Sequence, residues 1–218
     1  MKYVFAMSLV LLYSPIRADE CSRLPLPSVT VKRFEEPVSF NTTYDYKSIT
    51  VLGATEYHSA QRVLGLTRGE ASVQFEIQSS SLADPSGRWE CISPQIKVTY
   101  GFSPMMVYIA REFPKGSCAY NQVIQHELRH VKTYQDHLVS IERDITEALT
   151  RRFVTGTPWR GPVGQTFVLL EKEMQERWMP YIKREIGRVE SAQALIDTPE
   201  EYKRVSESCY GEIQMLTR

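Results

Sequence analysis

The sequence predicts an α+β fold in which a small, mostly antiparallel β-sheet region precedes a C-terminal bundle of about three helices. Segments rich in Val, Ile, Thr, Tyr and Phe, separated by Gly, Pro, Asn, Asp and Ser, fill the chain up to residue 110. Residues 119–153 then contain neither Gly nor Pro, and their apolar side chains recur at the period of an α-helix. We therefore divide the mature chain into a β-rich region, 19–115, and a helical region, 116–218, which could also form one integrated domain, 19–218.

The N-terminal segment, residues 1–18, has the pattern of a secretory signal peptide. Lys2 precedes an apolar run, 3–13, and the small residue Ala18 suits the cleavage site. The run is too short to span a bilayer as a stable helix, so we expect no stable membrane span after cleavage. The alternative is an uncleaved anchor. The prediction is an exported protein, either periplasmic or secreted.

The four cysteines also fit an exported chain, because an oxidising compartment favours disulfides. Their wide spacing matches no compact zinc site, so two disulfides are expected rather than a structural metal. Among the three possible pairings we favour Cys21 with Cys91 and Cys118 with Cys209, since each bond then closes one half of the chain on itself.

The β-rich region follows the pattern of short strands separated by turns. Strands are expected at residues 28–34, 38–46, 48–52, 71–78, 96–100 and 106–110. One short helix, 56–64, is expected between them, with Thr55 as its cap.

The helical region begins with the long helix expected at 119–153. A loop, 156–164, leads to a second helical stretch, 165–195, in which Pro180 is expected to cause a kink. A third helix begins at Asp197 or Thr198 and ends near Met215, because Thr198 can cap it and the following proline suits the first helical position.

The long helix contains the segment QHELRHVKTY, in which His126 and His130 lie one turn apart with Glu127 beside them. This is the HExxH arrangement of zinc peptidases: two imidazoles bind Zn²⁺, and the glutamate takes a proton from a metal-bound water. The alternative is an ordinary surface helix with two solvated histidines. The apolar stripe beside the histidines favours the metal site.

A catalytic zinc ion usually has three protein ligands, and the third is not evident from the motif. His137 is about 10 Å from His130 along a straight helix, which is too far. Asp136 has the spacing of one protease class, but the Gly that turns the chain in that class is missing. The remaining candidates are distant glutamates: Glu171, Glu173, Glu176, Glu201 and Glu207.

A disulfide between Cys118 and Cys209 would bring the third helix beside the motif. If the two helices are antiparallel, Glu201 and Tyr202 are level with His126, because each lies about eight residues from its cysteine. Tyr202 could then donate a hydrogen bond to a developing oxyanion.

The segments SCAYNQVIQHELRHVKTY and EEYKRVSESCYGE, with the segment 46–55 in the sheet region, resemble a family of bacterial exported proteins of unknown function that are described as zinc-dependent proteases. The resemblance spans most of the mature chain, although only HELRHV is specific. It implies a metal site at His126, Glu127 and His130. The chain departs from the family at Arg129, where Gly is common, and near Ser208, where His is common.

The chain has 26 basic and 26 acidic residues, so its net charge gives no indication of binding to nucleic acid. The expected function is that of an exported zinc-dependent peptidase with Glu127 as general base, acting on a peptide, a protein or a cell-wall peptide crosslink. Two alternatives stay open. One is a non-catalytic exported binding or structural protein, such as a degenerate peptidase, and the other is a metal-dependent amidase.

Overall fold

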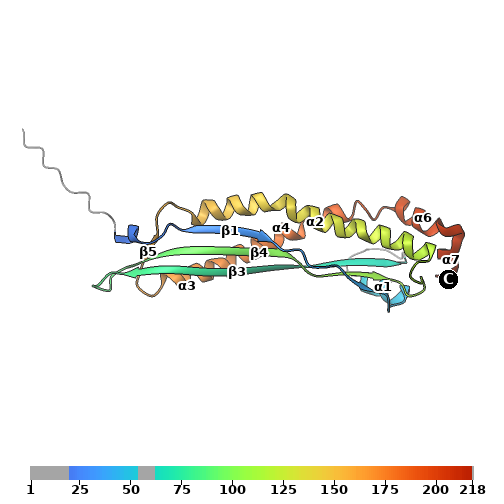
Figure 1. The fold of residues 1–218 in the computed structure, drawn as a ribbon, viewed down its shortest axis with the longest axis horizontal. Helices are drawn as coiled ribbons and strands as arrows, with labels where there is room; N and C mark the ends of the chain where they lie inside the picture. The colour runs from blue at the N-terminus through green and yellow to red at the C-terminus, as the bar shows by residue number, and fades with distance from the viewer. Residues whose placement is uncertain (1–19, 54–61, 218) are drawn as a thin grey trace, which may run out of the picture.

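The computed structural model describes residues 20–53 and 62–217. The molecule is elongated, with a long sheet and a long helix running side by side (Figure 1). The expected signal peptide lies outside the described residues, and so does most of the expected helix at 56–64. Residues 62–64, at the end of that helix, are not helical. The chain begins with a short 3-10 turn, η1 (Glu20–Arg23).

The sheet is built around its longest strand, β4 (Glu90–Ile109). β3 (Gly65–Ala83) pairs antiparallel with β4 over almost its full length, whereas β1 (Ser28–Arg33) and β2 (Ser39–Asn41) pair parallel with it and β5 (Trp159–Gly161) pairs antiparallel. The sheet is therefore mixed: β3 and β5 pair antiparallel, as expected, whereas β1 and β2 add parallel pairings that the sequence does not predict. The parallel pairings arise because β1 and β2 dock in succession along one edge of the same long strand.

The segments 96–100 and 106–110, expected as two strands, belong to one strand. In the sequence, Gly101 and Pro104 lie between these segments and favour a break between two strands. In the structure Gly101 stays in the strand, where a Cβ atom would lie 2.6 Å from the backbone oxygen of Phe34. The glycine thus permits a close approach of two backbones instead of ending the strand.

The expected strand at 48–52 is wrong, because these residues form the helix α1 (Tyr46–Gly53). Their β-branched side chains favour a strand, but the backbone N–H of Ser48 donates to Asp45 Oδ1 at 2.7 Å, which is a typical helix cap. The strand expected at 38–46 is correspondingly reduced to β2.

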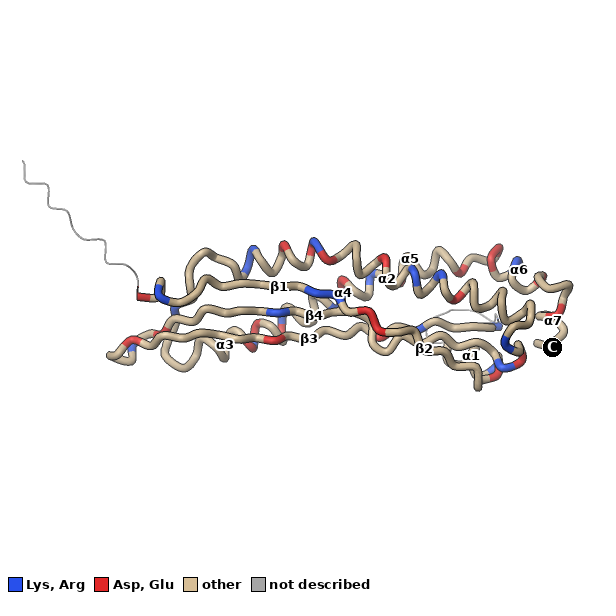
Figure 2. Tube along the Cα trace, viewed as in Figure 1, with Lys and Arg blue, Asp and Glu red and all other residues tan. Residues whose placement is uncertain are grey.

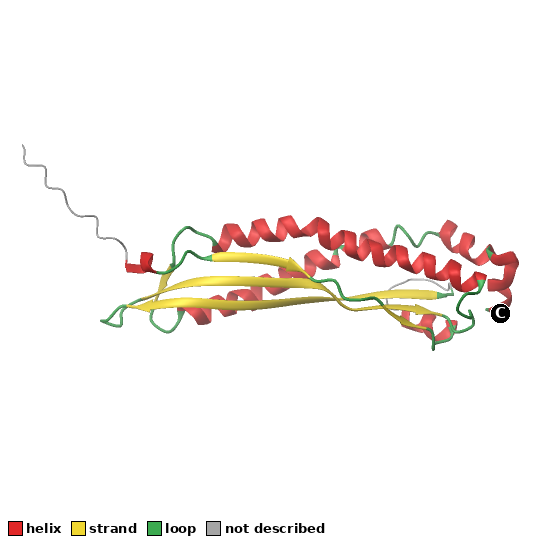
Figure 3. Ribbon diagram, viewed as in Figure 1, coloured by secondary structure: helices red, strands yellow, loops and turns green. Residues whose placement is uncertain are grey.

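The long helix is confirmed as α2 (Cys118–Phe153). Ser117 caps it by accepting from the backbone N–H of Tyr120 at 3.1 Å. The second half of its apolar stripe packs with the sheet and with α4 in one core cluster that includes Tyr100, Leu149 and Ile182. Figure 3 shows α2 running along the strands for most of their length.

The remaining helical region has more segments than the three helices expected. The second stretch comprises α3 (Thr166–Glu173), the π-helical turn η2 (Met174–Trp178), α4 (Met179–Gly187) and α5 (Val189–Gln193). Pro180, where a kink is expected, lies in the first turn of α4, two residues after the end of this π turn. Within the loop expected at 156–164, three residues form β5.

The third stretch divides into α6 (Pro199–Glu207), the 3-10 turn η3 (Cys209–Gly211) and α7 (Glu212–Leu216). Thr198 caps α6 as expected, accepting from the backbone N–H of Glu201 at 3.2 Å. The division falls at Cys209 and Tyr210, which both have positive φ angles.

Both favoured disulfides are confirmed, with Cα–Cα distances of 5.6 Å for Cys21–Cys91 and 5.7 Å for Cys118–Cys209. They lie at opposite ends of the elongated molecule, the first beside β5 and the second beside α6 and α7 (Figure 1). None of the helices in the described ranges is both long and apolar enough to cross a membrane. Acidic and basic residues alternate along the outer helices (Figure 2).

Candidate metal centre

The HExxH side chains lie on the buried face of α2. His126, Glu127 and His130 are 8%, 3% and 4% exposed, so they are not the solvated side chains of an ordinary surface helix. A helix places residues one turn apart on the same face, and here that face meets the start of β3 and the segment that leads into α6. The two imidazoles are thus shielded from bulk water.

Asp197 completes a cluster of three possible metal ligands with His126 and His130. Its Oδ1 atom lies 3.1 Å from His126 Nε2 and 3.2 Å from His130 Nε2, and the two imidazole nitrogens are 3.1 Å apart. The three atoms therefore form a nearly equilateral triangle. Sequence reasoning considered Asp197 only as a helix start, because the Thr-Pro pair that follows it is a strong capping signal.

This triangle has the size that a zinc ion requires. Zinc bonds to imidazole nitrogen and carboxylate oxygen are about 2.0–2.2 Å long, so one point about 1 Å from the plane of the triangle is at bonding distance from all three atoms. The angles between the bonds at that point are about 100°, which is near the tetrahedral value.

The partners of His130 favour the tautomer that a metal ligand needs. Its Nδ1 atom lies 2.6 Å from Gln193 Oε1, and Gln193 Nε2 donates to the backbone oxygen of His130 at 3.1 Å. Because the amide oxygen can only accept, Nδ1 carries the proton and Nε2 presents its lone pair to the triangle. Sequence reasoning missed Gln193, since no pattern links a glutamine to a histidine 63 residues away.

His126 has a carboxylate partner of the same kind. Its Nδ1 atom has two partners with opposite effects: Glu201 Oε1, at 3.2 Å, can accept a proton from it, whereas Arg129 Nη2, at 2.9 Å, can only donate to it. Arg129 and Arg204 both donate to the Glu201 carboxylate. Hydrogen bonds from Arg204, with smaller contributions from His126 and Arg129, outweigh burial and lower the pKa of Glu201 to about 2.

Glu201 thus lies level with His126, as the antiparallel arrangement predicts, but on the outer side of the imidazole. The other candidate carboxylates lie elsewhere in the described part of the chain. Glu173 accepts two hydrogen bonds from Arg152. Glu171 is exposed to solvent. The last three candidates lie at the surface, each within 4.0 Å of a lysine: Asp136, Glu176 and Glu207.

Glu127 is held against the sheet by residues at the start of β3. Thr67 Oγ1 donates to Glu127 Oε2 at 2.8 Å, and a Cβ atom at Gly65 would lie 2.5 Å from Glu127 Oε1. Burial raises the pKa of the Glu127 carboxyl, against the lowering effect of the two histidines. A raised pKa suits a group that must accept and release a proton near neutral pH.

A cavity of about 430 Å³ lies beside these groups, between β3, α2, α6 and α7. Its polar lining includes His126, Glu127, His130, Asp197 and Tyr202. Burial raises the pKa of the Tyr202 phenol, which therefore keeps its proton at neutral pH and can act as a donor. The apolar lining includes Val63, Leu66, Val123, Val205 and Ile213.

A second group of potential ligands in the described residues, Cys118, Cys209 and Glu212, cannot bind metal through sulfur because both cysteines are in a disulfide. Comparison with protein-family models, with curated proteins and with solved structures finds no match to this chain.

Proposed function

We propose that the protein is an exported zinc-dependent peptidase. The observation that carries the proposal is the triangle of Nε2, Nε2 and Oδ1 atoms of His126, His130 and Asp197, with Glu127 beside it at the edge of a cavity. Three electron-pair donors at about 3.1 Å from one another are unfavourable unless a proton or a cation lies between them, and Gln193 favours the proton of His130 on Nδ1, away from the other two atoms.

Each residue of the site has its own role in the proposed hydrolysis of a peptide bond. Bound zinc would act as a Lewis acid on the carbonyl and lower the pKa of water. Glu127 takes a proton from the attacking water and passes it to the amine that leaves when the C–N bond breaks. Tyr202, with its high phenol pKa, donates a hydrogen bond to the carbonyl oxygen as negative charge develops there.

Two features support an exported peptidase. The chain has two disulfides, which form and persist in oxidising compartments. The cavity is lined by apolar side chains around a few polar groups, as sites for organic substrates commonly are. The proposed substrates are peptides, proteins or cell-wall peptide crosslinks.

The test is metal analysis of the purified mature protein, combined with cleavage assays on peptide and protein substrates. The proposal expects about one zinc per chain, and cleavage that is lost in Glu127→Ala while the zinc remains. No metal in either protein would overturn it. Bound zinc without any cleavage would favour a non-catalytic binding protein.

A further inference from the structure

The segment that supplies Asp197, Glu201 and Tyr202 is held on the protein by few apolar contacts. We call this segment, residues 197–217, the C-terminal arm. Val205 and Ile213 are its buried apolar side chains among the described residues, whereas Tyr210 and Met215 are 106% and 62% exposed. Its helices have nine and five residues, and helices this short are not stable without tertiary contacts.

Asp197, Glu201 and Arg204 of the arm make polar contacts with α2. Arg204 donates to Gln122 Oε1 at 3.1 Å, but this pair is exposed to solvent. Asp197 Oδ1 lies 3.1 Å and 3.2 Å from the Nε2 atoms of His126 and His130, a contact that favours the arm when a proton or a cation lies between these atoms. Glu201 bonds to Arg129 and to His126, at the middle of this interface.

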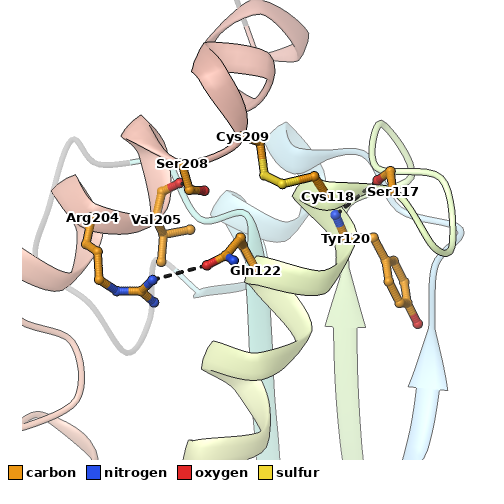
Figure 4. The surroundings of a disulfide bond; sticks show 8 residues. All are labelled: Ser117, Cys118, Tyr120, Gln122, Arg204, Val205, Ser208 and Cys209. Carbon is orange, nitrogen blue, oxygen red and sulfur yellow. Dashed lines mark hydrogen bonds between the residues drawn. A yellow bond between two sulfur atoms is a disulfide. The ribbon is translucent and has the colours of Figure 1, made fainter.

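The covalent contact is the disulfide between Cys118, the first residue of α2, and Cys209, two residues after α6 (Figure 4). Figure 4 shows this bond, which joins η3 to α2, and the Arg204–Gln122 hydrogen bond, which joins α6 to α2. The backbone at the bond is strained, because Cys209 and Tyr210 have φ angles of 59° and 55°, a region that residues other than glycine rarely adopt. Such conformations persist only where the surrounding structure holds them.

We infer that the Cys118–Cys209 disulfide positions the C-terminal arm so that the metal site is complete only in the oxidised protein. This inference rests on the metal site proposed above. Without the bond, Cys209 and Tyr210 relax from the left-handed region and α6 loses its anchor on α2. Asp197, Glu201 and Tyr202 then no longer share one arrangement around the imidazoles.

The bond forms when the two thiols give up two electrons and two protons to a disulfide oxidant, which becomes a dithiol. The reduced chain is therefore a form with weak metal affinity. An exported peptidase with this property gains its zinc site only after it reaches an oxidising compartment.

The other disulfide provides a matched control. Cys21–Cys91 joins residues 70 apart and Cys118–Cys209 joins residues 91 apart. Because the loop entropy that a disulfide removes depends on the logarithm of loop length, the two bonds constrain the unfolded chain to nearly the same extent. Only Cys118–Cys209 joins the arm to α2, the two segments that supply the residues of the proposed metal site.

The first experiment measures the zinc dissociation constant of C118S/C209S and C21S/C91S by competition with a chromophoric chelator. We expect the zinc affinity of C118S/C209S to be at least tenfold weaker, because loss of the contacts that orient metal ligands typically has an effect of this size. We expect less than a threefold change in C21S/C91S. Equal affinities in the two variants would overturn the inference.

The second experiment uses the unaltered protein and so does not depend on how the variants fold. Zinc bound between α2 and the arm would hold the arm in place, so it should slow the reduction of Cys118–Cys209 by tris(2-carboxyethyl)phosphine at least tenfold and leave that of Cys21–Cys91 unchanged. The thiols are alkylated and located by mass spectrometry. Equal rates with and without zinc contradict the inference.

A third readout needs no zinc. In the metal-free proteins, amide hydrogen exchange in α6 should be at least tenfold faster in C118S/C209S than in C21S/C91S. Unchanged exchange in α6 would show that the disulfide does not hold the arm. If the unaltered protein binds no zinc, the proposed function fails, and this measurement alone decides whether the disulfide positions the arm.

Discussion

Gln193 is the residue whose replacement tests the imidazole arrangement most sharply. It is 6% exposed, its Oε1 lies 2.6 Å from His130 Nδ1, and its Nε2 donates to the backbone oxygen of His130. Gln193→Leu removes both hydrogen bonds and leaves the Nδ1–H group buried without an acceptor, which costs about 1–3 kcal/mol in the metal-free protein. His130 can then carry its proton on Nε2, where it blocks the metal.

Removal of such an outer partner typically weakens metal binding about 10- to 100-fold, which corresponds to about 1.4–2.7 kcal/mol. Gln193→Glu is the matched control, because a carboxylate still accepts from Nδ1 while the donor to the His130 backbone oxygen is lost. We expect its zinc affinity to stay within about threefold of the unaltered protein. Zinc titration of both variants measures these affinities. Equal zinc affinity in Gln193→Leu and in the unaltered protein would refute the reasoning.

Three further predictions concern other parts of the molecule. In Gly65→Ala, the new Cβ would lie 2.5 Å from Glu127 Oε1 and displace the carboxylate, so we expect kcat to fall at least tenfold while zinc content, measured in parallel, is unchanged. Leu149→Ala should lower the free energy of unfolding in urea by about 2–5 kcal/mol, because Leu149 is fully buried in the core between α2 and the sheet; a loss below about 1 kcal/mol would contradict this packing. Although burial alone would raise the pKa of Glu173, hydrogen bonds from Arg152 and Trp178 hold it below its usual value of 4.5. Its stabilising contribution is therefore present above about pH 4.5 and lost as the pH falls through the lower folded value. Glu173→Gln should cost about 1 kcal/mol at pH 7 and nothing at pH 2, and a difference that persists in acid would show another cause.

The features that the sequence predicts correctly depend on local patterns. α2 is predictable because 35 residues without Gly or Pro, from Ala119 to Phe153, follow one helical period and a serine precedes them. The cysteine pairing is predictable because each bond closes one half of the chain. The helix start at Thr198 follows from the capping residue and the proline after it.

The features that it does not predict depend on contacts between distant segments. The parallel pairing of β1 with β4 depends on where the chain after β1 runs, which no residue in β1 encodes. Helix α1 has strand-forming side chains and is decided by a cap at Asp45. Asp197 and Gln193 lie about 70 residues from the histidines that they contact. For Glu201, the disulfide predicts which residue of α2 it lies beside. It does not predict which nitrogen of the His126 imidazole the carboxylate faces.

The most direct test of the metal centre compares zinc binding in Asp197→Asn and Glu201→Gln. In the proposed site Asp197 Oδ1 would bond the metal, whereas Glu201 would contact it only through the outer nitrogen of His126. We predict that Asp197→Asn retains less than about a tenth of the zinc bound by the unaltered protein, and that Glu201→Gln keeps the full amount with a weaker affinity. Full zinc occupancy and unchanged affinity in Asp197→Asn would contradict the proposed site.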